Sequence, residues 1–304
     1  MVKIRRFRCL SLILFILRTV QGFSGTSPPS SEPPIFLPTT SDALVRQAAS
    51  AISAALLDNS IHRQCIRLPL SESMYSESEE GFVADRAIGW QGGPQETIRY
   101  LQPLVEQLLR TVETLPNNEA SKGGLTARIQ SQVLLEFDGS ALLTSECPGG
   151  AKGDATALLQ PNTDSYYLQT IQSVEEQFSD TPGKAKRLFL LVNPAWRDAN
   201  SFGLFQSKKA QKQILDRYTT TYAIDQFVVR GQKLSVVKAW PHDWCLFWSK
   251  LYPDDRNDDL ETKPEFLGSF PERPEYNVMD ELVQSALMEM EERLNKDGAR
   301  PQGQ

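Results

Sequence analysis

Apolar residues recur at two spacings along the chain, and the way these spacings alternate predicts the fold class. Helical spacing, with apolar residues three and four apart, marks four stretches: 41–58, 98–112, 164–178 and 277–294. Shorter apolar or alternating runs predict strands at 61–68, 127–137, 157–159, 187–192, 219–230 and 232–239. Strands that alternate with helices are typical of βαβ units. We therefore predict an α/β fold with a mostly parallel central sheet and helices on both faces.

Two of the predicted strands indicate how the sheet is built. Residues 187–192 read RLFLLV and are apolar after the arginine, as in a strand that is covered on both faces. The runs 219–230 and 232–239 meet at Gly231, which predicts an antiparallel hairpin near the C-terminal end of the domain and makes the sheet mixed. Residues 139–156 are rich in glycine and are predicted as a loop, and 205–218 are predicted as a basic helix.

Changes in composition suggest where the chain divides. We expect a single α/β domain over 41–252, an acidic, proline-rich linker over 253–276, an amphipathic helix over 277–295 and a disordered tail over 296–304. The apolar stripe of the last helix could dock a partner or pack on its own domain; it comprises Met279, Val283, Leu287, Met290 and Leu294.

The first 40 residues have the composition of a targeting sequence. Residues 1–22 combine a basic start with a nine-residue apolar run, which is the layout of a signal peptide. Residues 23–40 begin with Phe23 and are rich in Ser, Thr and Pro, like a transit peptide. This bipartite order resembles the plastid presequences of diatoms and related algae. We expect a plastid protein of the stroma or thylakoid surface, with secretion as the alternative.

Charge and composition exclude several classes of protein. The chain has 304 residues, 40% hydrophobic, and a formal net charge of −6, which argues against a general affinity for nucleic acid. The three cysteines of the mature chain, Cys65, Cys147 and Cys245, are too scattered for a disulfide framework. After residue 22 no apolar run approaches 18 residues, so we expect no transmembrane segment in the mature chain. Peripheral association with the thylakoid surface is compatible with this expectation.

Motifs for common cofactors and metals are weak or missing. His62 and His242 are the only histidines, so we predict no zinc site. The run 254–259, DDRNDD, resembles a magnesium-binding pair of aspartates but is more typical of a solvated loop. The glycines at 149–153 lack the Gly-Lys-Ser/Thr ending of a phosphate loop. We therefore expect no cofactor and no metal, and assign no catalytic residue.

The segment after the apolar strand at 187–192 is the first candidate for a ligand or partner site. Ligands of open parallel sheets bind beyond the carboxyl ends of the strands, and Asn193 stands at such an end. Pro194 forces an extended exit, which would place Trp196 over the crevice. The structural alternative is that Asn193 caps the strand and Pro194 shapes the loop.

An aromatic cluster after the predicted hairpin is the second candidate. Trp240, His242, Asp243 and Trp244 lie within five residues, and aromatic anchors supply much of the contact area of binding sites. The alternative is core packing beneath the hairpin, which is the commoner fate of tryptophan. His242 and Asp243 are adjacent, and neighbours on a strand point to opposite faces, so a catalytic dyad is not expected.

Taken together, several of these segments resemble a family of plastid and cyanobacterial proteins known as a domain of unknown function. The resemblance lies in LFLLVNP at 188–194, Arg217-Tyr218, WPHDW at 240–244 and GWQGG at 89–93, and it covers about 41–250. Relatives in that family take part in photosystem II assembly or are appended to plastid adenylate kinases. The resemblance implies an α/β domain with an accessory role in the plastid, and it brings no catalytic residues.

Two functions are therefore expected from the sequence. The first is a non-catalytic plastid accessory protein that binds an unidentified protein partner, for example during assembly of a photosynthetic complex such as photosystem II. The alternative is a domain, regulatory or catalytic, that binds a nucleotide or a phosphate metabolite.

Overall fold

A computed structural model of the chain describes residues 33–70, 93–115, 127–177, 187–202, 208, 210–249 and 264–298. All of them belong to one compact unit that begins at Pro33. The described residues leave out the predicted signal peptide, most of the transit-like segment, residues 89–92 of the family resemblance, the run 254–259 and the tail from 299.

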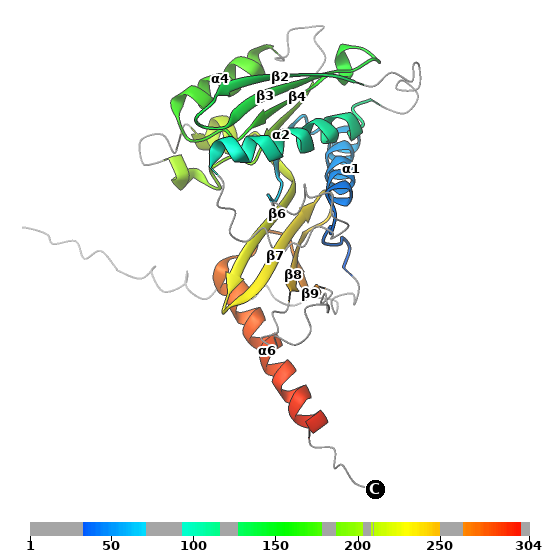
Figure 1. Cartoon of the computed structure of the whole chain (residues 1–304), viewed down its shortest axis with the longest axis vertical. Coiled ribbons are helices and arrows are strands. Elements are labelled where there is room, and N and C mark those ends of the chain that lie inside the picture. The colour runs from blue at the N-terminus through cyan, green and yellow to red at the C-terminus, as the bar shows by residue number, and fades with distance from the viewer. Residues whose placement is uncertain are drawn as a thin grey trace, which may run out of the picture. The chain divides into compact units, whose positions relative to one another are not determined.

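The described residues form one nine-stranded mixed sheet with the order β2-β3-β4-β5-β1-β6-β7-β8-β9 (Figure 1). Its centre is parallel and consists of β4 (Ala155–Leu159), β5 (Leu188–Val192), β1 (Arg63–Arg67) and β6 (Thr219–Val229). Antiparallel strands flank it: β2 (Arg128–Leu135) and β3 (Ser140–Glu146) on one side, and β7 (Gln232–Ala239), β8 (Trp244–Ser249) and β9 (Glu265–Phe270) on the other. The predicted α/β class, parallel centre and terminal hairpin are confirmed, but the antiparallel part is larger than expected.

Helices cover both faces of this sheet, as predicted. One face packs on α1 (Ser41–Asn59) and α2 (Pro94–Thr111). The opposite face packs on α4 (Ser165–Gln177), the single-turn helix η4 (Ala199–Phe202) and the π-helical turn η5 (Gln211–Leu215) over the parallel strands. The same face packs on α6 (Tyr276–Gly298) over β6, β7 and β8. A further short turn, η3 (Ala151–Gly153), precedes β4.

Strand alternation explains how one sheet supports two cores. Leu190 and Val192 of β5 enter the core under α1 and α2, whereas Phe189 and Leu191 enter the core under α4 and η5. Successive side chains of a strand point to opposite faces, so a strand that is apolar at every position buries both. The fully buried LFLLV run of β5 therefore takes the central place that its composition predicts.

Two predicted connections turn out to be strands. The predicted linker 253–276 contains β9, which pairs with β8, so the sheet continues past residue 252 and the prediction of a linker is wrong there. The predicted loop 139–156 contains β3, which pairs with β2 and β4. Both strands carry polar residues or glycine, which lowers strand propensity, and pairing with neighbours overrides it.

Two helices also differ in detail from the prediction. The helix predicted over 98–112 begins four residues earlier, because α2 runs from Pro94 to Thr111, and the exposed Pro103 inside it does not end it. The predicted basic helix 205–218 is represented, within the described residues, by Lys208, Ala210 and the π-helical turn η5. The C-terminal helix is confirmed as α6. Its residues Met279 and Val283 are buried against the sheet, so this part of the apolar stripe packs on its own domain, which is one of the two expected alternatives.

Candidate functional site

The connections that follow the central strands β1 and β5 run to opposite faces of the sheet, which makes this position a topological switch point. The two strands lie side by side and parallel, but β1 leads toward α2 on one face of the sheet and β5 leads to η4 and η5 on the other. Open α/β sheets bind ligands at such a point, outside the carboxyl ends of the strands, because the two diverging connections leave a crevice. Arg67 and the segment 193–196 stand at this end of the sheet.

Asn193 closes the gap between the two strand ends. Its side-chain oxygen accepts a hydrogen bond from the Leu68 N–H at 2.7 Å, and its amide nitrogen donates to the Leu68 carbonyl at 2.9 Å. Its backbone has φ +48°, a left-handed conformation that asparagine tolerates better than most residues. Both functional ends of the side chain are therefore engaged, which favours the structural interpretation of Asn193 over direct ligand contact.

Arg67 fixes the exit loop behind Asn193. One terminal nitrogen donates to the Pro194 carbonyl at 3.0 Å and the other donates to the Trp196 carbonyl. Both bonds are to neutral main-chain acceptors, so the positive charge of Arg67 is oriented but is not neutralised by them.

A cavity of about 620 Å³ opens beside Arg67, on the face of the sheet that carries η5. This lies within the size range of small-molecule sites. Strands β1, β5, β6 and β8, the loop after β5, η5 and the corner between β9 and α6 supply its walls. Trp196 and Trp244, which the sequence analysis proposed from separate segments, both line it.

Asp225 is the buried acid of this cavity and pairs with two arginines. Its side chain is only 7% exposed, and it accepts a hydrogen bond from Arg273 Nε at 2.7 Å. Arg197 approaches the other carboxylate oxygen at 3.6 Å. Both guanidinium groups also lie over the Phe227 ring, at 5.1 Å for Arg273 and 5.7 Å for Arg197. Three segments far apart in sequence thus meet around one carboxylate.

Positive charge is crowded at this wall. Burial is the main cause that lowers the pKa of Arg197, Asp225 opposes it, and repulsion from Arg273 and Arg67 adds to the lowering. One nitrogen of Arg273, Nη2, is buried and has no hydrogen-bond partner among the described residues. An additional anion at this wall would relieve the mutual repulsion of the guanidinium groups.

Cys65 lies on the cavity floor but is a poor nucleophile. Burial raises the pKa of its thiol to about 11, although the nearby Arg67 acts in the opposite direction. At neutral pH the thiol is therefore protonated, and the thiolate is the reactive form. The cavity wall that the described residues form offers positive charge, aromatic surface and a neutral thiol.

The remaining candidates of the aromatic cluster do not join this cavity in the described structure. Trp240 packs against the core under α1 and α2, and its buried indole nitrogen finds no partner within the part of the chain that the structure describes. His242 and Asp243 are exposed in the turn between β7 and β8. The cluster is therefore divided: Trp244 contributes to the cavity wall, while Trp240 is core.

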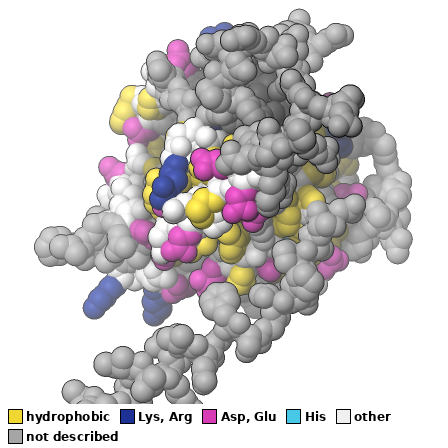
Figure 2. Space-filling view, turned by 90° about the horizontal axis from the view of Figure 1, so that it is seen from below, with side chains coloured by type: hydrophobic (Ala, Val, Ile, Leu, Met, Phe, Trp, Pro, Cys, Tyr) yellow, Lys and Arg dark blue, Asp and Glu magenta, His cyan; other side chains and the backbone are white. Residues whose placement is uncertain are grey.

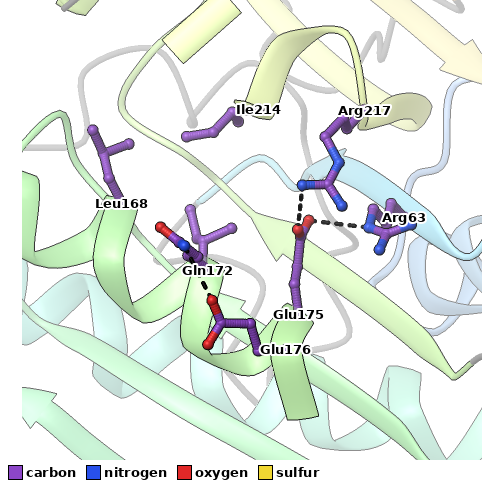
Figure 3. A pocket seen from close by; sticks show the side chains of 8 residues that line it. Arg63, Leu168, Gln172, Glu175, Glu176, Ile214 and Arg217 are labelled. Atoms are coloured by element: carbon purple, nitrogen blue, oxygen red, sulfur yellow. Dashed lines mark hydrogen bonds and ion pairs between the residues drawn. The ribbon is translucent and has the colours of Figure 1, made fainter. Parts of the chain in front are cut away.

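A second, smaller cavity of about 230 Å³ lies at the opposite end of β1 (Figure 3). Glu175 projects from α4 between Arg63 and Arg217, at 3.0 and 2.5 Å, and also accepts a hydrogen bond from Tyr218 at 3.0 Å. Burial and the adjacent carboxylate hold the pKa of Tyr218 well above its ordinary value. Because these groups satisfy one another, we interpret this network as an anchor between α4, β1 and η5.

Neither a metal centre nor a membrane span emerges from the part of the chain that the structure describes. Within those residues, no three His, Cys, Asp or Glu side chains lie close enough together to hold a metal ion. Among the described helices, none combines the length and apolarity that crossing a bilayer requires.

By its fold and its cavity, the protein is an α/β domain with a crevice of small-molecule size at the switch point of its sheet. Comparison with protein families makes this specific: residues 38–281 match the model of a domain of unknown function, DUF1995, and the chain belongs to this family. The match confirms the resemblance to a family of unknown function and extends through β9 into α6. Neither a curated protein nor a solved structure matches the chain.

The charged residues of the crevice were missed by the sequence analysis. Arg67, Asp225 and Arg273 come from β1, β6 and the β9–α6 corner, which are separated by long stretches of chain. One signal was available: Asp225 interrupts an otherwise apolar stretch of a predicted strand, where a charge needs a buried partner. Nothing local in the sequence identified that partner.

Proposed function

We propose that this chain is a binding domain that takes a small anionic molecule in the switch crevice. The observation that carries the proposal is a cavity of about 620 Å³ in which Arg197 and Arg273 converge on one buried carboxylate, Asp225, while Arg67 lines the same wall without a carboxylate partner among the described residues. Arginine is suited to this task because its planar guanidinium matches the oxygens of carboxylates and phosphates. Nucleotides and phosphate metabolites, the alternative expected from the sequence, belong to this class.

The rim of the crevice moderates this charge without cancelling it at the inner wall. Asp198 and Glu272 also line the cavity, but both are exposed, and the Asp198 carboxylate already accepts hydrogen bonds from Ser201. Exposed charges are screened by water and salt more strongly than buried ones. The rim acids would therefore slow the entry of a polyanion more than they would lower the affinity for a ligand bound at Arg67.

A thermal-shift screen with nucleotides, sugar phosphates and organic carboxylates tests the proposal. A ligand at a hundredfold excess over its dissociation constant should add about 2.7 kcal/mol to the free energy of unfolding. Arg67→Met should remove this stabilisation, and Arg67→Lys should keep part of it. Arg110→Met is the matched control, because Arg110 is exposed on α2 and pairs with Glu106 on the same helix. The proposal is wrong if no anion shifts the wild type, or if Arg67→Met responds like the control.

A role as a plastid accessory protein is the second candidate, and the two are compatible. It is supported by the basic and apolar start of the chain, the Ser/Pro-rich segment that follows, and membership of the family. An edge strand gives it a surface: in the described residues β2 pairs only with β3, and Val133 on it is 54% exposed. Exposed sheet edges can pair with an added strand from a partner.

Imaging and affinity purification test this second candidate. A fluorescent fusion of the full chain should reach the plastid, and a Phe23→Ala fusion should not. Purification from plastids should then recover a partner from the wild type but not from Val133→Lys, because charged side chains, lysine above all, oppose the pairing of a further strand at a sheet edge. Secretion of the fusion, or recovery of no partner above background, would contradict the accessory role. On the face drawn in Figure 2, the described residues present acidic side chains scattered among apolar ones.

A further inference from the structure

The floor of the crevice has a neutral part that is set by strand register. Leu191 of β5 and Thr220 of β6 both pair with Cys65 of β1, so the three residues form one row across the parallel centre of the sheet. All three line the cavity. The Thr220 side chain hydrogen-bonds the Cys65 sulfur, and the thiol stays protonated at neutral pH. This row therefore carries no charge, and its one hydroxyl, that of Thr220, is engaged with the Cys65 sulfur.

The walls above the neutral row are apolar as well. Ile214 and Leu215 of η5, together with Trp196, line the same cavity. Tyr218 joins them, and its hydroxyl is bound to Glu175, away from the ligand space, so its ring is the part available to the cavity. Trp196 is itself held by the Phe202 ring at 5.1 Å between ring centres.

Charge begins two residues further along β1. Arg67 follows Cys65 on the same face, roughly 7 Å away at about 3.3 Å per residue of strand. Beyond it in the direction of β6 lie Asp225 and its two arginines. The crevice is thus graded along the strands, from a neutral, apolar half under η5 to a positively charged half near the β9–α6 corner.

From this gradation we infer that the ligand is an amphiphilic organic anion, with its acidic group at Arg67 and an apolar body over the row Leu191, Cys65 and Thr220. This inference rests on the proposed function and names the ligand class within it. A bare inorganic anion would leave the apolar half unfilled. A ligand that is polar throughout would bury polar groups against leucine, isoleucine and aromatic side chains, and the Thr220 hydroxyl and the Gln211 amide nitrogen at this wall already have partners, so burial there costs free energy.

A ladder of straight-chain carboxylates tests the ligand class. Calorimetric titration of the full-length mature protein with butanoate, hexanoate and octanoate should show affinity that rises about fourfold for each added methylene until the apolar half is filled. The matched alcohols, hexanol and octanol, should bind far more weakly, because they lack the charge that Arg67 recognises. Pyrophosphate is an anion without an organic body, and ATP is a polyanion whose body carries many polar groups, so both should bind more weakly than octanoate.

Two variants locate the ladder in the crevice. Leu215→Ser removes part of an apolar wall at a partly buried position, so it should weaken octanoate roughly tenfold and leave butanoate nearly unchanged. Leu57→Ser is the matched control at an exposed position of α1, on the other face of the sheet, and should leave the whole ladder intact. If Leu215→Ser fails to fold, Cys65→Ser is the second test of the cavity floor, because serine has nearly the same shape as cysteine but is more polar, and it should also weaken octanoate more than butanoate.

The outcomes separate the two proposals. If no anion binds, both the proposed function and this inference are wrong. If anions bind with Arg67-dependent affinity that does not change with chain length, or if ATP binds more tightly than octanoate, the anion site stands and the amphiphilic ligand is wrong. If the ladder survives Leu215→Ser and Cys65→Ser unchanged, the apolar body does not lie over this row and the inference is overturned.

Discussion

Replacing Asn193 by alanine is expected to destabilise the protein by breaking the clamp between the ends of β1 and β5. Asn193 makes two hydrogen bonds, one to each main-chain polar group of Leu68, at 2.7 and 2.9 Å. Leu68 is only 4% exposed, so its N–H and carbonyl would lose these partners in a largely buried place. The change also puts a non-asparagine residue at φ +48°.

The size of the effect follows from these contacts. Each net hydrogen bond contributes about 1 kcal/mol, so the pair contributes about 2 kcal/mol. Alanine in the left-handed conformation adds about 1 kcal/mol of strain. We therefore expect Asn193→Ala to lower the free energy of unfolding by about 3 kcal/mol. Asn193→Gly avoids the strain but loses the same hydrogen bonds, so it should cost about 2 kcal/mol or slightly more, given the entropy of glycine.

Urea unfolding followed by circular dichroism measures this directly. With a slope near 3 kcal/mol per molar urea, a loss of 3 kcal/mol moves the midpoint down by about 1 M. Asn277→Ala, at an exposed position of α6, is the control and should change the free energy by less than about 0.5 kcal/mol. An Asn193→Ala protein as stable as the wild type would refute the clamp, and a glycine variant much less stable than the alanine one would refute the assignment of strain.

Three further predictions concern the thiol, the last helix and its ion pair. Iodoacetamide should label Cys65 far more slowly in the native protein at pH 8 than in urea, because burial raises the thiol pKa to about 11; equal rates, read by mass spectrometry, would contradict this. Met279→Ala should lower the free energy of unfolding by about 2–4 kcal/mol, because Met279 is only 1% exposed. Met288→Ala is the control at a 52% exposed position and should change the free energy little. Similar urea midpoints for the two variants would show that α6 does not pack as described. Hydrogen bonds from Arg230 hold the pKa of Asp280 below its ordinary value. The pair therefore stabilises the start of α6 at pH values above the pKa of an unfolded aspartate. This stabilisation is lost as the pH falls through the lowered pKa of the folded state. The protection of the α6 amides against hydrogen exchange, corrected for the intrinsic rate at each pH, should fall over that range in the wild type by more than in Asp280→Asn; equal losses of protection in the two proteins would contradict this.

The regular elements of the fold were accessible from the sequence because their patterns are local. The predicted helix 41–58 corresponds to α1, and the predicted strands 187–192, 219–230 and 232–239 correspond to β5, β6 and β7. The strands β3 and β9 were missed because Ser140, Thr144 and Gly268 give them a weak pattern, and pairing with neighbours decides their conformation. Such pairing joins residues far apart in sequence, which no local periodicity reports.

The candidate site could be predicted only in part, for the same reason. The rule that ligands bind at the carboxyl ends of parallel strands pointed to the segment after β5, and Trp196 does line the crevice. The rule cannot tell a ligand contact from a structural bond, and Asn193 proved to hold Leu68. The charged wall depends on Arg67, Asp225 and Arg273 meeting in space, which the sequence alone does not encode in any short pattern.

A crystal structure of the mature protein grown with 8-bromooctanoate tests the ligand crevice most directly, because the bromine can be located by its anomalous scattering. We predict that the carboxylate lies against Arg67 and that the bromine lies over the row of Leu191, Cys65 and Thr220, with Trp244 at the cavity wall. Bromine positions only elsewhere on the molecule, from crystals in which the crevice is open to solvent, would contradict the account.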